Sequence, residues 1–241
     1  MSLSAFSAFI EELEDVKTES LTTEEISKKY IVPRNSKTGN PYINVYLGKK
    51  DEHGKPYVAT ATVFVSHAWQ YNFHDVVFTA IQQHTKEHPD SYFWFDLFTN
   101  DQHNVRDKSF EWFSSTFRDM IHNIGATLLI LSPWNDPVLL HRVWCLFEVY
   151  NALETSATLH IQVPRSEREK LADAVVQDSD CLIQKLSNIR IEKAEATVES
   201  DKERILKVIQ NSVGGFHGVS KQVKNRLRAL YMEQLDDLAR E

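Results

Sequence analysis

The stretch Thr127-Leu128-Leu129-Ile130-Leu131-Ser132 predicts a strand whose apolar residues follow one another without alternation. Such a strand is typical of the centre of a parallel sheet, because helices cover both of its faces. On either side of it, short β-forming segments alternate with amphipathic helical segments. We expect strands at 62–66, 92–95, 127–132 and 159–163, a shorter fifth strand at 188–192, and connecting helices at 74–86, 108–124 and 139–153.

This alternation predicts an α/β fold. Because parallel strands are joined by right-handed crossovers, we expect a flavodoxin-like parallel five-stranded sheet, in the order 2-1-3-4-5, between helical layers. An N-terminal helical arm and connector, residues 1–58, precedes this α/β domain at 59–198, and a C-terminal helical extension, 199–241, is expected to pack on it. Within the arm we expect a strand at 43–47 and a helix carrying the apolar residues Phe6, Phe9, Ile10, Leu13 and Val16.

The composition is that of a soluble globular protein, with 42% hydrophobic and 25% charged residues. A net charge of −7 lacks the basic surface that nucleic-acid binding requires, so no nucleic acid is expected as a partner. The 2 cysteines do not form a disulfide framework, and we find neither a signal-peptide pattern nor a membrane-spanning apolar run. We therefore expect a cytoplasmic protein with no membrane partner.

Nucleotide-cofactor motifs are missing from the sequence. No G-x-G-x-x-G follows the first expected strand, and no G-x-x-x-x-G-K-[ST] occurs anywhere in the chain. Ordinary dehydrogenases and P-loop nucleotide hydrolases are thereby disfavoured, and no resident cofactor is expected.

Residues His84 to His88 match the H-x-x-E-H pattern, in which two histidines four residues apart can hold zinc on one helix face. Pro89 follows at once, so the helix is expected to end there and to spoil the alignment of the second histidine. No third ligand is evident. We expect a solvated helix end that binds no metal, with zinc-dependent hydrolysis as the alternative.

Cys145 and His141 lie one helical turn apart, a spacing that could pair a thiol with a base. Cysteine is one of the most buried residue types, and this one lies in an apolar segment. We therefore expect Cys145 to pack in the core.

Polar and aromatic residues follow the ends of the expected strands, where ligands of open α/β sheets bind. Trp144 and Glu148 share one helix face, among apolar neighbours that predict a partly buried carboxylate. That carboxylate is either a surface glutamate beside a core tryptophan or a catalytic group beside an aromatic platform. The other candidates are Ser66, His67, Ala68 and Trp69 after the first strand, Asp96 after the second and Trp134 after the third.

Two motifs resemble those of one known family. Val63-Phe64-Val65-Ser66-His67-Ala68 resembles the first strand and loop of bacterial Toll/interleukin-receptor (TIR) domains, typically hydrophobic-F-[IV]-S-[HY]-[AS]. The segment 142–149, Arg-Val-Trp-Cys-Leu-Phe-Glu-Val, is similar to the plant TIR signature S-x-W-C-L-x-E-L, with the W-x-x-x-E spacing that NAD-cleaving TIR enzymes share. The resemblance covers roughly residues 60–165. The loop 99–106 departs from it, because it lacks the Pro-Gly of many signalling TIR domains.

The resemblance implies an NAD+ glycohydrolase that releases nicotinamide and ADP-ribose, or a cyclic ADP-ribose, in stress or immune signalling. Glu148 would be the catalytic residue, and NAD+ or NADP+ would be the substrate. Substrate contacts would come from Trp144, Ser66, His67, Ala68, Trp69, Asp96 and Trp134. Self-association through TIR surfaces is expected. Two alternatives remain: a non-catalytic TIR-like interaction module, and a glycosidase acting on another nucleoside or nucleotide.

Overall fold

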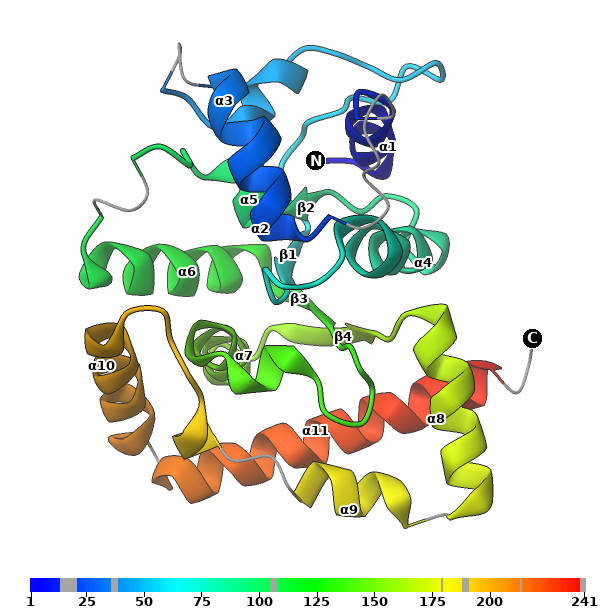
Figure 1. Cartoon of the computed structure of the whole chain (residues 1–241), viewed down its shortest axis with the longest axis vertical. Helices are drawn as coiled ribbons and strands as arrows, with labels where there is room; N and C mark the ends of the chain where they lie inside the picture. The colour runs from blue at the N-terminus through cyan, green and yellow to red at the C-terminus, as the bar shows by residue number, and fades with distance from the viewer. Residues whose placement is uncertain are drawn as a thin grey trace.

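A parallel sheet lies at the centre of the protein, as Figure 1 shows for the computed structural model. The structure describes residues 1–13, 21–35, 39–104, 108–178, 180–187, 191–212 and 214–238. The strands are β1 Val63–Ser66, β2 Phe93–Trp94, β3 Ala126–Ile130 and β4 Thr158–Gln162, in the order β2-β1-β3-β4. Phe64 stands beside both Trp94 and Thr127, and Leu129 stands beside Ile161. The α/β class and the order of the first four strands are therefore as predicted.

The prediction of a fifth strand at 188–192 is wrong for residues 191 and 192, the part of it that the structure describes. Residues 188–190 lie outside the described residues, and the next residues form a short 3-10 helix, Ile191–Lys193. The outer edge of β4 is instead met by the long helix α11, Gly215–Leu238, whose Arg226 donates a hydrogen bond to the Leu159 carbonyl at 3.0 Å. A fifth strand would need this same edge.

Three helical connections join the strands. A π-helix, Phe73–Phe78, runs into α4, Thr79–Glu87, between β1 and β2. Between β2 and β3 lie the short helix α5, Asp96–Thr99, and then α6, Phe110–Ile124. Between β3 and β4 lie a 3-10 helix, Val138–His141, and then α7, Val143–Glu154. Figure 1 shows α4 on one face of the sheet and α6 with α7 on the other, the arrangement that right-handed crossovers require.

Local chemistry sets the limits of α6. The side chain of Ser109 accepts a hydrogen bond from the backbone N–H of Trp112, which caps the beginning of the helix. The helix ends at Ile124, and Gly125 follows it with a φ of 75°. Glycine adopts this left-handed conformation without steric cost. The chain passes directly from this turn into the buried strand β3.

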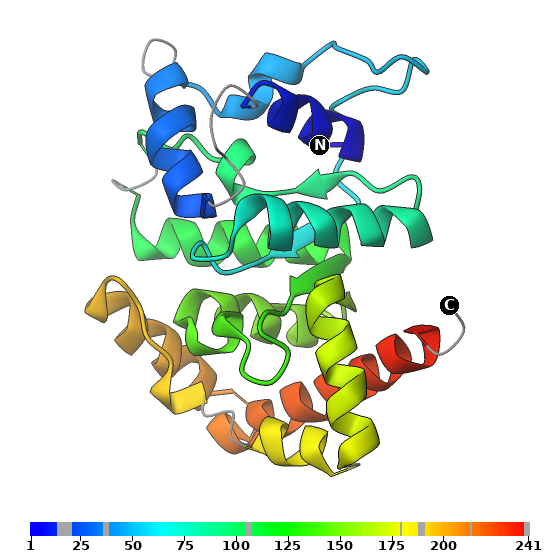
Figure 2. The same cartoon turned by 45° about the vertical axis from the view of Figure 1, so that its right-hand side comes forward.

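The N-terminal arm gathers at the β2 side of the molecule (Figures 1 and 2). It contains α1 Leu3–Glu11, α2 Thr23–Ile26, a π-helix Ser27–Ile31 and α3 Val32–Asn35. The strand expected at 43–47 is wrong, because Tyr42–Tyr46 forms a 3-10 helix. Both of these end tyrosines are buried, and their hydroxyls donate to Glu12. Val16, expected on the first helix, lies outside the described residues.

The C-terminal helices gather at the opposite, β4 side, as both views show. They are α8 Arg165–Gln177, α9 Cys181–Ser187, α10 Glu199–Gln210 and α11. One continuous cluster of buried apolar side chains includes Phe6 of the arm, Leu128 of the sheet and Tyr231 of α11. The arm and the extension therefore share the core of the sheet domain.

The edge of the sheet at β2 is also met by another segment. The backbone N–H of Phe93 donates to the Met1 carbonyl at 2.7 Å. Both outer strands thus bond to chain outside the sheet.

Among the described residues, no helix combines the length and the apolar character needed to cross a membrane.

Candidate active site at the end of β1

The site lies where the order of the strands reverses. The chain leaves β1 for β2 on one side and then crosses to β3 on the other, so the reversal falls between β1 and β3. Ligands of open α/β sheets bind outside the carboxyl ends of strands at such a point. Ser66 is the last residue of β1 and is fully buried.

Glu148 is the central group of the site. It lies on the first turns of α7 with its side chain buried, and the Ser66 hydroxyl donates a hydrogen bond to its carboxylate. Burial raises the pKa of the Glu148 carboxyl to about 8, and the nearby Asp96 charge adds to the rise, while the Ser66 hydrogen bond opposes it. A pKa of about 8 means that Glu148 is mostly protonated at neutral pH.

A second, partly buried carboxyl lies close by. Asp96 begins α5 directly after β2, and its Oδ2 accepts a hydrogen bond of 2.8 Å from the indole N–H of Trp69. Its other oxygen, Oδ1, is buried without a hydrogen-bond partner. Burial raises the pKa of Asp96 to about 6, against the opposing effect of the Trp69 hydrogen bond. Two carboxyl groups with raised pKa values at one end of a sheet are characteristic of functional sites.

His67 and Ala68 are buried beside these groups. The His67 ring stacks on Phe95, with 4.5 Å between ring centroids, and its Nε2 has no hydrogen-bond partner. Burial lowers the pKa of His67 to about 3, so the ring is neutral. The Cys145 thiol lies 3.4 Å from the His67 carbonyl, to which it donates.

Two of the predicted substrate-binding residues have other surroundings. Trp144 is partly buried, and its ring packs against Phe110, Phe113 and Phe117 of α6 at centroid distances of 5.5–5.8 Å. Trp134 is buried; its backbone N–H donates to Glu167 of α8, and its carbonyl accepts from Tyr231 of α11. The structure thus brings together six of the predicted site residues: Ser66, His67, Ala68, Trp69, Asp96 and Glu148. Trp144 and Trp134 instead contact other helices.

Tyr71 is a supporting residue to which the sequence did not point. Its hydroxyl accepts hydrogen bonds from the backbone N–H groups of Ser132 and Leu139, at 3.2 and 3.1 Å. It therefore ties the loop after β1 to the segment between β3 and α7. An aromatic residue in a loop carries no signal of this role, because only the fold decides which backbone groups meet its hydroxyl.

The H-x-x-E-H segment differs from our expectation. Helix α4 ends at Glu87, before Pro89, as predicted, but His84 is 1% exposed and therefore not part of a solvated helix end. A third histidine, His160 of β4, lies against the pair.

The other candidate pair, Cys145 with His141, is separated in the structure. The His141 ring contacts Asp136 at 2.6 Å, whereas Cys145 packs in the core as predicted. This pair therefore forms no thiol–base site.

Two surface cavities have volumes of about 340 and 360 Å³. Within the described part of the chain, Glu148 lines neither of them. Glu148 is 9% exposed, so little of its side chain faces solvent.

Comparison of the chain with protein-family models gives no match, and searches of curated proteins and of solved structures give no significant match.

Proposed function

We propose that this protein is a TIR-like NAD+ glycohydrolase with Glu148 as its catalytic residue. The observation that carries the proposal is the buried Glu148 carboxyl, which accepts a hydrogen bond from Ser66 at the reversal point of a parallel sheet. The order β2-β1-β3-β4 is compatible with the flavodoxin-like architecture of TIR domains. The motifs at 63–68 and 142–149 place the same two residues in the family's pattern.

The chemistry needs a carboxylate and no redox group. The bond between the nicotinamide nitrogen and C1′ of the ribose breaks, and its electron pair leaves with neutral nicotinamide. The ribose then carries oxocarbenium character, which an ionised Glu148 stabilises electrostatically. Water adds to C1′ and loses a proton, which gives ADP-ribose; attack by a nitrogen of the adenine instead gives a cyclic product. NADP+ can undergo the same reaction.

The charge of the substrate favours the active form of the enzyme. Glu148 is largely protonated when it is enclosed, but the cationic nicotinamide ring lowers the pKa of a neighbouring carboxyl. Binding of NAD+ therefore promotes the loss of the proton that the reaction requires. The enclosed position of Glu148 also fits a site that opens on self-association in the cytoplasm, as the TIR resemblance implies for stress or immune signalling.

Incubation of the purified protein with NAD+ or NADP+, followed by chromatography of the products, tests the proposal. Release of nicotinamide by the wild type and its loss in Glu148→Gln are expected. Cleavage of other nucleosides or nucleotides in preference to NAD+ would favour the broader glycosidase alternative. Assays over a range of protein concentrations test whether activity depends on self-association.

A non-catalytic interaction module is the second candidate. The observation in its favour is that Trp144 packs against α6 and that Glu148 is enclosed, so neither is presented to a ligand in this state. Absence of nicotinamide release at every protein concentration, from a well-folded chain, would favour this candidate.

A further inference from the structure

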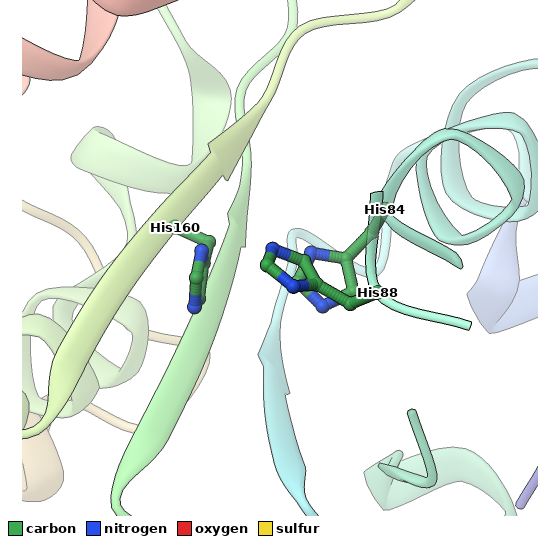
Figure 3. Close-up of side chains that lie close together, drawn as sticks. All are labelled: His84, His88 and His160. Atoms are coloured by element: carbon green, nitrogen blue, oxygen red, sulfur yellow. The ribbon is translucent and has the colours of Figure 1, made fainter. Parts of the chain in front are cut away.

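Three histidines from two distant segments converge on one point (Figure 3). His84 lies on α4, His88 follows the end of that helix, and His160 lies in the middle of β4. One ring nitrogen from each lies within 4.8 Å of the others. The ring centroids are 4.6, 5.0 and 4.9 Å apart.

The end of α4 preserves the alignment of the first pair. Although the helix ends at Glu87, the backbone N–H of His88 still donates to the His84 carbonyl at 2.9 Å. The two imidazoles therefore keep the one-turn relationship of a helical i, i+4 pair. The proline that follows does not separate them.

The His84 ring is buried without a hydrogen-bond partner. Its side chain is 1% exposed, and neither Nδ1 nor Nε2 has a hydrogen-bond partner. A buried polar group without a partner is costly, and native structures seldom contain one. A ligand at the meeting point of the three rings would satisfy it.

A cleft of about 360 Å³ opens beside His88 and His160. Glu87, Glu233 and Arg226 also line it, so two carboxylates and one guanidinium contribute charge there. The Arg226 guanidinium is engaged by the Leu159 carbonyl at 3.0 Å. Solvent can therefore reach the exposed side of the histidine cluster.

We propose that His84, His88 and His160 bind one divalent transition-metal ion of the zinc class, with the remaining coordination position facing this cleft. Three imidazoles suit zinc, copper or nickel, whereas magnesium and calcium prefer oxygen ligands. Zn–N bonds of about 2.0–2.1 Å in tetrahedral geometry place ligand nitrogens about 3.4 Å apart, so small side-chain rotations close the site. The ion would join the end of α4 to β4. This reverses the expectation, drawn from the missing third ligand, that the segment binds no metal.

The site is independent of the proposed NAD+ cleavage. Helix α4 runs back from the carboxyl end of β1 toward the beginning of β2, so its last turn lies away from Ser66 and Glu148. Metal binding can therefore be tested without any assay of activity.

The test uses the full chain without a histidine tag, stripped of metal with a chelator. Zn²⁺ is titrated in competition with a chromogenic chelator, and Co²⁺ is added separately to record its visible spectrum. We expect one Zn²⁺ per chain, a rise in Tm on binding, and the Co²⁺ bands of a tetrahedral nitrogen-ligated site.

His88→Ala is the main variant, because His88 is exposed and its loss should leave the fold intact. Both His88→Ala and His160→Ala should weaken Zn²⁺ binding by more than the roughly 10–100-fold that loss of an outer-shell partner costs. His122→Ala, which removes an exposed histidine from α6, is the matched control and should bind as the wild type does. Absence of Zn²⁺ binding by the wild type, or binding that both cluster variants leave unchanged, would overturn the proposal.

Discussion

The hydroxyl of Ser66 donates a hydrogen bond to the carboxyl group of Glu148, which lies 82 positions further along the chain. The contact joins the end of β1 to the first turns of α7 across the point where the strand order reverses. Because a hydroxyl can rotate to donate or to accept, Ser66 can stay hydrogen-bonded to Glu148 whether the carboxyl is ionised or protonated.

Glu148→Gln should lower the rate of NAD+ cleavage by a factor on the order of 10²–10³, because the amide keeps the size of the side chain but carries no charge. It should also raise the Tm at pH 8 and above, since ionising a buried carboxyl without a cationic partner costs free energy. Product chromatography and thermal melts check both effects. Wild-type turnover by a folded Glu148→Gln protein would remove Glu148 from the mechanism.

The free energy of unfolding should fall as pH rises from about 4.5 to about 8, because Glu148 has a folded-state pKa of about 8 against an ordinary value of 4.5. Over this range the native state holds a proton that the unfolded state has lost, so each pH step weakens the native state. Denaturant titrations of the wild type and Glu148→Gln at several pH values isolate the contribution of Glu148 to the pH dependence of the free energy of unfolding. An equal pH dependence in both proteins would contradict the assignment.

Activity should change with pH in the opposite direction. If the carboxylate is the active form, kcat/KM should rise with pH and level off above about 8, the pKa of Glu148 in the free protein. Ser66→Ala removes a hydrogen bond that lowers this pKa, so it should move the profile to higher pH. A profile in Ser66→Ala that coincides with that of the wild type would show that this contact does not tune Glu148.

Tyr71→Phe should lower the free energy of unfolding by about 2–6 kcal/mol, because two backbone N–H groups lose their acceptor at about 1–3 kcal/mol each. These are the N–H groups of Ser132 and Leu139. Tyr92→Phe is the control: its hydroxyl donates to the Pro56 carbonyl in an exposed hydrogen bond, and its loss should cost less than about 0.5 kcal/mol. Urea denaturation measures both; equal costs would contradict the role given to Tyr71.

Trp144→Ala should destabilise the protein by about 3 kcal/mol, because the indole packs against the aromatic side chains of α6. Trp144→Phe should retain most of this packing and cost less than about 1.5 kcal/mol. If the role of Trp144 is packing, Trp144→Phe should also retain NAD+ turnover. A large rise in KM with unchanged stability would instead place the indole against the substrate.

The order of the first four strands could be predicted from the sequence, because strands alternate with helices and their crossovers are right-handed. Ser66 and Glu148 could be placed at the same edge of the sheet, where parallel strands end, but their hydrogen bond could not be predicted. The partners of Trp144 could not be predicted. Helical spacing indicates that Trp144 and Glu148 share a face, but it does not say which neighbouring helix covers the first turn of α7.

The third histidine escaped prediction for a similar reason. His160 lies between Leu159 and Ile161 in β4, more than 70 positions after His84 and His88, so no sequence motif connects the three histidines. Only the packing of α4 against β4 brings the three rings together. Tyrosine and valine favour strands, which is why a strand is expected at 43–47. A strand would place Asn44 on the same face as the buried Tyr42 and Tyr46, but Asn44 is exposed, which fits the 3-10 helix.

The hydrogen bonds at the two margins of the sheet bear on how copies of this protein can assemble. Exposed peptide groups on an outer strand are a template on which another molecule can add a strand, a common origin of aggregation. Here the N–H of Phe93 already donates to the Met1 carbonyl, and the carbonyl of Leu159 already accepts from the Arg226 guanidinium. An incoming strand would have to displace these bonds and the helix that carries Arg226. Oligomers of this protein should therefore form through the side chains of its helices and loops, and not by extension of one sheet into the next.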